Sequence, residues 1–562
     1  MHMKKYYILL YILCIVVFIS GCGLATIPES HQIKEDKTVL DSTVQPNKTH
    51  FLPEKGGELR IALTAPDTLN PLLTESRDTL NFLKLIYESP ITYDASGKPT
   101  PSLFSDWEVS SDGRLWIFKV RKGVKWHNGE ELDGNDILFT LEALQSGLVK
   151  SFYQFDIFEN INIVEYGLRN EDPYTVYIRL GQPTYHILDI FTFPVLSKDI
   201  YQSIENILIM HENEDFIPIG TGPYKIDIAH YDGNENTIRL IRNESWWGGE
   251  LYIDSILAKV YENNDASRTA FLEGQVDLVD TMVIYANTVW NRNNVEYHKY
   301  LTTEFEFLAL NNSKSLFQDK TIKHAMAYAI DRKDIISKVY INNAETVDVP
   351  IPSTSWLYDS NYRIYDFEVD KARKLLYDAG WKDSDADGVL DKHIDGKKVD
   401  LSFSLLTNEE NNSRRDVAEL ISNQLSLLGF QVNVEIEPWD IILEEKIPNG
   451  EFDVILTGYN MHPANDLRFL FHSDEIGKGL NNFIRYKSSE LDRLLDNASR
   501  SFTEEERLKA YQRIQEHITN ELPIISLYFK TGTLLTDTRV RGIDRLINFD
   551  IYKDIESWFL IQ

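Results

Sequence analysis

The first strongly patterned stretch of the chain lies around residue 60. Leu59, Ile61 and Leu63 are apolar and alternate with Arg60 and Ala62. Successive side chains of a strand point to opposite faces, so this alternation predicts a strand with one buried face. The patterned part of the chain therefore opens with a half-buried strand.

A helical period appears in the middle of the chain. Between Thr321 and Tyr340, apolar residues recur at spacings of one, three and four residues, at Ile322, Ala325, Met326, Ala329 and Ile330. This spacing places them on one face of a helix. We therefore predict helical structure in this range.

A β-α-β unit is predicted next. The apolar run Leu401 to Leu406 is followed by a helical pattern from Ser413 to Leu428, with Gly429 as its C-cap. Apolar residues then alternate with polar ones at Phe430, Val432, Val434 and Ile436. A strand, a helix and a second strand in succession favour a mixed α/β fold.

The end of the chain repeats these signals. Thr503 and Glu506 have the spacing of a capping box, which predicts a helix that begins there and continues to about Asn520. Pro523 ends that helix, and the apolar run 524–529 predicts a strand. Strands and helices thus alternate along the chain, and the fold class is α/β.

The first residues predict export. Lys4 and Lys5 precede an apolar run from Tyr6 to Phe18, and Ile19 to Cys22 read I-S-G-C. This order is typical of a secretory signal, and the run is shorter than the ~20 residues of a membrane-spanning helix. The I-S-G-C tetrad resembles a bacterial lipobox, which implies a signal peptide at 1–21 and an acylated (palmitate-bearing) Cys22 at the mature N-terminus.

The anchor and the composition fix the expected compartment. Residues 22–54 are polar and mixed, which predicts a flexible tether that holds the protein at the extracellular face of the cell membrane. The alternative is an ordinary signal peptide with a chance cysteine. The only two cysteines are Cys14 and Cys22, so the rest of the chain can form neither a disulfide nor a thiolate metal site. The net charge of -30 argues against nucleic-acid binding.

Several spaced segments together resemble family 5 of the solute-binding proteins of ABC importers, which includes oligopeptide-, dipeptide- and nickel-binding proteins. The segments, in family order, are Gly56–Ala62, Thr68–Pro71, Leu103–Gly129, Asp136–Thr140, Pro218–Lys225, Arg242–Gly249, Phe271–Leu278, Ala327–Arg332 and Lys371–Trp381. The likeness therefore extends from residue 55 to the C-terminus.

The resemblance implies a fold and a division into domains. The fold is two-lobed and periplasmic-binding-protein-like, of type II and in its large three-domain variant, with a hinge between the lobes. Lobe one (domain I) is expected at 55–85, 218–308 and 523–562, the inserted domain II at 86–217, and lobe two (domain III) at 309–522. The hinge strands are expected at 307–312 and 523–528.

The resemblance also implies where a ligand binds. The family places a tryptophan after a strand of lobe two, which corresponds to Trp439, and a loop that corresponds to Gly458–Asp466. Gly458 and Asn460 would pair with a peptide backbone, and Tyr459 stands where the family has tryptophan. His462 falls at the position of the family's amino-binding aspartate, so Asp466 is the nearest acid that could replace it.

Lobe one contributes further candidates. Thr74, Glu75 and Ser76 follow the T-L-N-P segment and resemble cleft residues of the family. The alternative for every candidate in either lobe is a surface or packing role, and for Trp439 and Tyr459 that role is core packing. We assign no catalytic residue, no metal ligand and no cofactor.

One acidic loop is independent of the resemblance. Asp383, Asp385, Asp387 and Asp391 occupy positions 1, 3, 5 and 9 of a loop, and this spacing is similar to that of a calcium loop. Position 12 is Ile394 instead of the bidentate glutamate. We therefore favour an acidic surface turn over a calcium site.

These observations predict a non-enzymatic, monomeric lipoprotein. It would capture a peptide by lobe closure and deliver it to the transmembrane subunits of an ABC importer. A nickel–chelate carrier of the same family is the first alternative, and a surface receptor for signalling peptides is another. A secreted enzyme is disfavoured, because the sequence contains no H-E-x-x-H, G-x-S-x-G or phosphate-loop motif.

Overall fold

The computed structural model describes residues 52–149, 151, 161–210, 216–230, 236–282, 292, 294–394 and 396–561. The predicted signal peptide, Cys22 and the tether up to residue 51 lie outside the described residues. The described residues belong to one compact unit, Leu52–Gln562. No helix within them has the length and apolarity needed to cross a bilayer.

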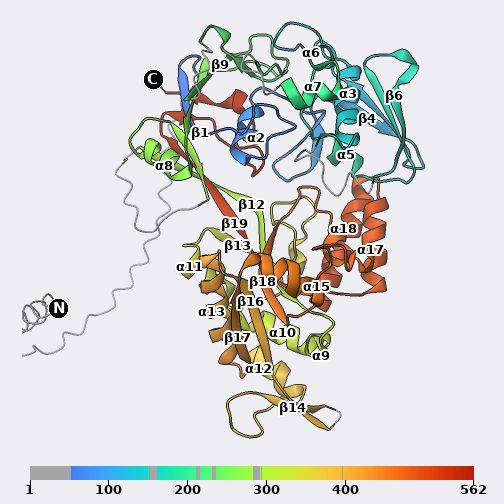
Figure 1. The fold of residues 1–562 in the computed structure, drawn as a ribbon, viewed down its shortest axis with the longest axis vertical. Helices are drawn as coiled ribbons and strands as arrows, with labels where there is room; N and C mark the ends of the chain where they lie inside the picture. Colours follow the sequence, from blue (N-terminus) through green and yellow to red (C-terminus); the bar gives the residue numbers. More distant parts are fainter. Residues whose placement is uncertain are drawn as a thin grey trace, which may run out of the picture. The chain divides into compact units, whose positions relative to one another are not determined.

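An eleven-stranded mixed sheet runs through this unit (Figure 1). Its strands follow the order β17-β16-β18-β12-β19-β11-β1-β10-β9-β8, and β13 pairs separately with β19. The first group of strands comprises β1 (Glu58–Thr64), β8 (Tyr224–Ile226), β9 (Thr237–Arg242), β10 (Ser255–Tyr261) and β11 (Leu278–Thr281). The predicted alternation of buried and less buried residues in β1 is confirmed.

Two long antiparallel strands connect the two ends of the sheet (Figure 1). They are β12 (Val295–Leu310) and β19 (Ile524–Asp537), with β13 (Ala344–Thr346) beside β19. The predicted hinge segments lie where these strands pair with each other, with Phe307 opposite Ser526 and Ala309 opposite Ile524. The chain therefore passes twice, side by side, between the two groups of strands.

A separate four-stranded antiparallel sheet, in the order β4-β5-β7-β6, lies in the predicted insertion. Its strands, with the β2–β3 hairpin before them, are β2 (Ile91–Tyr93), β3 (Pro99–Pro101), β4 (Phe104–Val109), β5 (Leu115–Val120), β6 (Ile163–Leu168) and β7 (Thr175–Leu180). The helices of this region are α3 (Gly134–Gln145), α5 (Ile187–Ile190), α6 (Lys198–Tyr201) and α7 (Ile204–Ile209). Helices α2 (Arg77–Leu83) and α8 (Asn264–Leu272) accompany the first group of strands.

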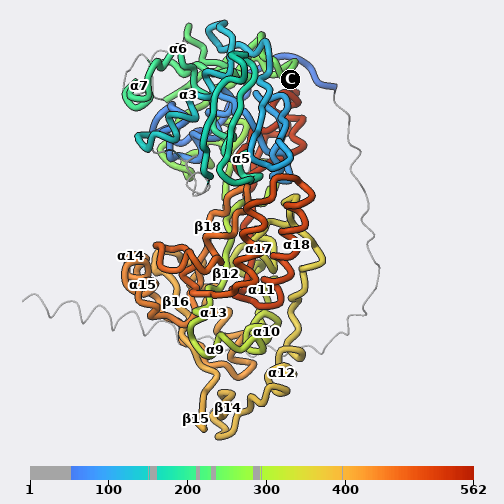
Figure 2. The backbone as a smooth tube through the Cα atoms, turned by 90° about the vertical axis from the view of Figure 1, so that its right-hand side faces the viewer, coloured from blue at the N-terminus to red at the C-terminus, as the bar shows by residue number. Residues whose placement is uncertain are grey.

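Helices surround the other end of the large sheet. The strands there are β16 (Ser402–Asn408), β17 (Gln431–Glu437) and β18 (Val454–Asn460), and a hairpin is formed by β14 (Asp391–Ile394) and β15 (Lys397–Asp400). The helices are α9 (Ser315–Gln318), α10 (Lys320–Ala329), α11 (Arg332–Val339), α12 (Val369–Asp378), α13 (Asn412–Ser426), α14 (Trp439–Ile441), α15 (Ile447–Asn449), α16 (Arg468–Phe471), α17 (Ser489–Arg500) and α18 (Glu504–Glu521). Figure 2 shows α17 and α18, which pack against each other. The last pair of strands is β20 (Val540–Arg541) and β21 (Phe559–Leu560).

The predicted elements of this region are found, with two differences. Gly429 was predicted as the C-cap of the helix that follows β16, but α13 ends at Ser426 and its C-cap is Leu427. Strands β16 and β17 are parallel and joined by α13, so the β-α-β unit is confirmed. The capping box of Thr503 and Glu506 begins α18 as predicted. The helical range 321–340 is divided into α10 and α11, because Ile330 is extended and the Asp331 side chain caps a new helix at Asp334 N.

Candidate functional site

A cavity of about 660 Å³ lies beside α2 and the C-terminal segment of the chain. Its lining residues fall within 75–102, 192–248, 303–304, 460–463 and 547–556. Ligand pockets of proteins typically measure roughly 300–1,000 Å³. The cavity therefore has the size of a ligand site, and the stretch 460–463 of its wall begins at the last residue of β18.

A carboxylate and two indoles form a polar centre in this wall. Trp246 Nε1 and Trp247 Nε1 donate to the carboxylate of Glu88 at 3.0 and 2.9 Å, and Thr221 Oγ1 donates to it at 2.7 Å. Burial raises the pKa of Glu88 to about 7, although these three donors and Arg121 oppose the shift. The cavity therefore contains a carboxyl group that titrates near neutral pH.

Two glycines allow this arrangement. A Cβ atom on Gly220 would lie 1.9 Å from the carbonyl oxygen of Ile86, and one on Gly222 would lie 2.7 Å from the same oxygen. The two backbone segments can approach this closely only because both residues lack a side chain. The close contact places Thr221, between the glycines, next to Glu88.

The candidates near the T-L-N-P segment separate into two kinds. Glu75 lines the cavity. Thr74 is only 1% exposed and its hydroxyl donates to Asp67, while the Ser76 side chain caps α2 by accepting from Thr79 N at 3.3 Å. Of these three candidates, Glu75 is thus the one that the structure places at the cavity.

Two aromatic candidates lie outside the cavity lining. Trp439 begins α14, is partly buried, and donates its backbone N–H to Glu410 at 2.9 Å. The ring of Tyr459 stacks on Phe307 with centroids 5.8 Å apart, and its hydroxyl donates to the carbonyl of Leu480 at 3.0 Å. These contacts are the packing roles that we considered as the alternative for both residues.

The end of β18 leads into the cavity. Gly458 and Asn460 pair with β12, and β18 pairs with β16 only at Val454 and Ile455 among the described residues. The N–H of Met461 donates to the carbonyl of Thr303, on the side of β12. The N–H and C=O groups of successive strand residues point to alternate sides of the strand. Since the N–H of Met461 points toward β12, the backbone groups of residues 458 and 460 point away from β12, although both residues stand opposite residues of β12. Asn460 itself lines the cavity.

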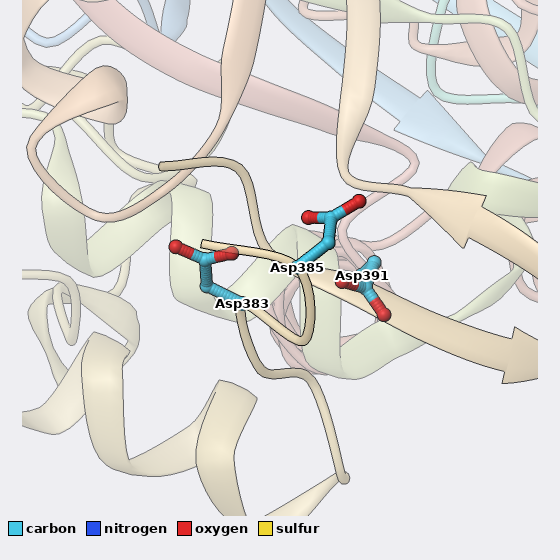
Figure 3. Close-up of side chains that lie close together, drawn as sticks. All are labelled: Asp383, Asp385 and Asp391. Atoms are coloured by element: carbon cyan, nitrogen blue, oxygen red, sulfur yellow. The ribbon is translucent and has the colours of Figure 1, made fainter. Parts of the chain in front are cut away.

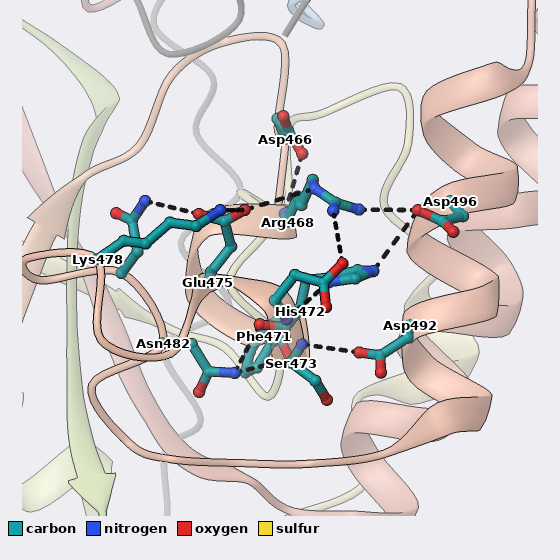
Figure 4. Close-up of polar contacts among 12 residues, drawn as sticks. Asp466, Arg468, Phe471, His472, Ser473, Glu475, Lys478, Asn482, Asp492 and Asp496 are labelled. Atoms are coloured by element: carbon teal, nitrogen blue, oxygen red, sulfur yellow. Dashed lines mark hydrogen bonds and ion pairs between the residues drawn. The ribbon is translucent and has the colours of Figure 1, made fainter.

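His462 lines the cavity and Asp466 does not. Nδ1 of His462 accepts from Ala464 N at 3.1 Å, and burial lowers the pKa of this histidine to about 4. Asp466 accepts from the backbone N–H of Arg468 at 2.9 Å, and the Arg468 side chain pairs with Asp496 at 2.8 Å (Figure 4). Asp466 therefore lies in a polar cluster behind the loop, and the structure does not bring it to the cavity.

Comparison with known proteins decides the family. Residues 98–478 match the model described as bacterial extracellular solute-binding proteins, family 5 middle. The chain belongs to this family. It is 28% identical over 520 residues to the oligopeptide-binding protein AppA of Bacillus subtilis (strain 168), covering 91% of this chain and 93% of AppA. It is 23% identical to the dipeptide-binding protein of Escherichia coli (strain K12), covering 79% of this chain and 86% of the relative.

Solved structures agree with this family 5 assignment. The structure of AppA from Bacillus subtilis in complex with a nonapeptide has a TM-score of 0.61 at 26% identity and covers 91% of this chain and 100% of AppA. HbpA2 from Haemophilus parasuis has a TM-score of 0.75 at 20% identity, covers 90% of this chain and 100% of HbpA2, and shows the fold alone. The predicted type II, periplasmic-binding-protein-like α/β fold is confirmed. The protein is thus a family 5 solute-binding protein, of the kind that serves ABC importers of peptide- or nickel-type solutes.

Sequence reasoning missed much of this family 5 protein's cavity wall. The wall includes Lys84, Glu88, the Trp246–Trp247 pair, and residues 547–550 and 552–556. The tryptophans stand in a quoted family segment, but nothing in that segment indicates a cavity. The C-terminal stretch lacks a periodic pattern, and its only visible signal is a mixture of aromatic and charged residues.

Beside the cavity, the predicted insertion contacts α18 (Figure 1). Asp189, on α5, accepts from the Tyr93 hydroxyl and from Nδ1 of His186, both at 2.9 Å. Arg507, on α18, lies 4.0 Å from Asp189 and donates to the carbonyl of Ala464 at 2.8 Å. A buried cation of one segment therefore faces a buried carboxylate of the other.

The acidic loop of the family 5 protein is compact. Asp383, Asp385 and Asp391 each place a carboxylate oxygen within 4.8 Å of the others (Figure 3). Asp387 is outside this group and accepts the backbone N–H two residues further on at 2.8 Å. Asp383 and Asp391 accept backbone N–H groups of the loop, and Lys398 pairs with Asp385. Hydrogen bonds and a lysine thus hold the turn, and the preference for an acidic surface turn over a calcium site stays a prediction of the sequence.

Proposed function

We propose that this protein captures peptides in the 660 Å³ cavity by lobe closure and delivers them to the transmembrane subunits of an ABC importer. The observation that carries the proposal is the presence of a ligand-sized cavity in a chain similar over 91% of its length to an oligopeptide-binding protein. That relative has been solved with a nonapeptide.

The end of β18 supports a peptide rather than a compact solute. The backbone groups of Gly458 and Asn460 face away from β12, where an extended peptide could pair with them as an added strand. Asn460, His462 and Glu75 line the same cavity. Backbone pairing of this kind binds peptides with little dependence on their side chains, which suits a carrier.

We extend the proposal to the anchor and to the division into lobes. Acylation of Cys22 would hold the protein, as a monomer, at the extracellular face of the membrane, with residues 22–54 as the tether. The two lobes would follow the segments given above and close by bending at 307–312 and 523–528. Residues 1–51 are outside the described structure, so the anchor rests on the sequence alone.

Native mass spectrometry of the purified protein tests the proposed function. We expect co-purified peptides to be released on denaturation, and binding heat when a random nonapeptide mixture is added to the emptied protein. Absence of both, for peptides and for metal chelates, would contradict solute capture.

A nickel–chelate carrier is the second candidate, because His462 lines the cavity and burial lowers its pKa to about 4. A histidine with this pKa is neutral at pH 7, which is the form that coordinates metal ions. Bound nickel without peptide in the same mass spectra would favour this candidate over peptide capture.

A further inference from the structure

Lys84 occupies an unusual position in the cavity wall. It follows the last residue of α2, its side chain is half-buried, and it lines the cavity. Its ammonium donates to the carbonyl oxygen of Phe549 and lies 5.6 Å from the centre of the Phe549 ring. Both partners are uncharged, so they solvate the cation without neutralising it.

The charge of Lys84 is only partly compensated. An ammonium group has three N–H donors, and within the described residues no carboxylate lies within 4.0 Å of this one. Arg77, which lines the same cavity, differs because it meets Asp280 at 3.2 Å. Burial lowers the pKa of Lys84, the charge of Asp550 opposes this shift, and the charge of Lys553 adds to it.

We infer that Lys84 binds a carboxylate group of the ligand, an inference that rests on the proposed function. A cation that has lost part of its water without gaining an anionic partner raises the free energy of the empty cavity. A ligand carboxylate would supply the missing acceptors as charge-assisted hydrogen bonds, which are about twice as strong as neutral ones. Lys84 is therefore placed to donate hydrogen bonds to one negatively charged group of a ligand and to balance its charge.

The rest of this wall limits the kind of ligand. Asp550, Asp554 and Glu556 line the same cavity as Lys84 and Lys553. Burial raises the pKa of Glu556, and the charges of Asp554 and Asp550 raise it further, so negative charge is already concentrated here. A ligand with several negative charges would be repelled, whereas one carboxylate on a dipolar molecule, such as a zwitterionic peptide, would be accepted.

Matched peptide mixtures test the inference on the full-length protein. The probes are random nonapeptides with a free C-terminal carboxylate, the same mixture as C-terminal amides, and amides with glutamate at the last position. We expect the unmodified protein to bind the free acids at least about tenfold more tightly than the amides. If the glutamate-bearing amides also regain affinity, the subsite accepts a side-chain carboxylate as well as a terminal one.

Three variants distinguish a direct contact with Lys84 from the electrostatic field of the cavity as a whole. Lys84→Met should reduce the acid-to-amide ratio to about one, and Lys84→Arg should keep most of it. Lys553→Met removes the same charge from another lining residue and should leave the ratio near that of the unmodified protein. Thermal melting confirms that each variant is folded.

The possible results discriminate between the two proposals. Equal affinity for acids and amides in the unmodified protein would overturn the inference and leave peptide capture intact. A ratio that persists in Lys84→Met would also overturn the inference alone. If none of the three mixtures binds, the proposed function fails and the inference fails with it.

Discussion

Two buried carboxylates lie where distant parts of this chain meet, and their surroundings differ. Glu306, on β12, is 2% exposed and is held by Arg414 through two bonds of 2.9 Å, with Lys530 of β19 at 3.3 Å. Asp189, on α5, is 3% exposed, and the cation that faces it, Arg507, is 4.0 Å away.

The difference lies in what each contact joins. The Glu306 cluster connects strands that are already hydrogen-bonded to each other. Arg414 lies in the first turn of α13, which begins shortly after strand β16 ends. The Asp189 contact joins the predicted insertion to α18 through the side chains of Asp189, His186 and Arg507, without a shared sheet. Separation of the two segments would therefore break the second contact and leave the first intact.

Removal of the Glu306 charge should have the largest effect. In Glu306→Gln, the side chain of Arg414 stays largely buried without its anion, while Lys530 keeps Glu304 as a partner. Loss of one partner of a buried ion pair typically costs about 3–5 kcal/mol of folding free energy. We expect a large fall in the urea midpoint of unfolding, with little change in the separation of the two segments in the folded protein.

Glu304→Gln is the matched control, because Glu304 also pairs with Lys530, at 3.1 Å, but its side chain is 36% exposed. Exposed pairs contribute about 0–1 kcal/mol, so its midpoint should change little. Equal effects of the two substitutions would show that the buried cluster has no special role in stability.

Replacement of Arg507 should have a smaller effect on stability and a clear effect on the contact. Arg507→Met removes a charged group that faces Asp189 and His186 of the insertion and donates to the carbonyl of Ala464, a change worth about 2 kcal/mol. We expect faster release of bound peptide, by about tenfold or more, and a wider separation of the segments. The chain has no cysteine beyond Cys22, so labels at Asp106→Cys and Lys374→Cys, in a Cys22→Ser background, can report this separation by energy transfer.

Arg513→Met controls for the loss of an arginine from the same helix. The Arg513 side chain is largely exposed and lies 3.6 Å from Glu516, so the label separation should not change. If Arg507→Met also left the separation and the release rate unchanged, the contact beside the cavity would have no part in holding the segments together.

Local patterns predicted the elements of this fold but not these contacts. The alternation at Leu59–Leu63 and the capping box at Thr503 involve neighbours within a few residues, so the sequence contains the whole signal. Asp189 and Arg507 are far apart in the chain, and a pattern that marks a buried face does not specify its partner. Asp189 and Arg507 meet only in the folded chain, where α5 of the predicted insertion lies against α18.

The candidate site shows the same division. The family resemblance indicated the loop after β18, and Asn460 and His462 do reach the cavity. Tyr459 and Asp466 were indicated by the same resemblance but make other contacts: the Tyr459 hydroxyl donates to the carbonyl of Leu480, and Asp466 accepts from the backbone N–H of Arg468. Lys84 and residues 547–556 were not indicated at all, since neither belongs to a segment with a recognisable spacing.

The smallest expected effect is a pH dependence confined to the Asp189 contact, which can be traced to His462. Burial lowers the pKa of His462 to about 4, from an ordinary value of 6.5, while nearby Asp189 opposes the shift and His186 adds to it. Between pH 6.5 and 4, an exposed His462 would take up a proton and the buried one would not, so the contact loses stability as the pH falls.

Burial alone would raise the pKa of Asp189, but His186 and Arg507 together lower it, so this carboxylate stays charged over the same range. We expect the label separation to widen when the pH falls from 7 to about 5.5, by the equivalent of roughly 1 kcal/mol, and His462→Gln to remove that dependence. The separation is a better measure than melting, because burial also lowers the pKa of His127 to about 4, and His127 would change overall stability in the same range from its site at Gly220 and Gly222. A separation that changes equally in His462→Gln would assign the pH dependence to another group.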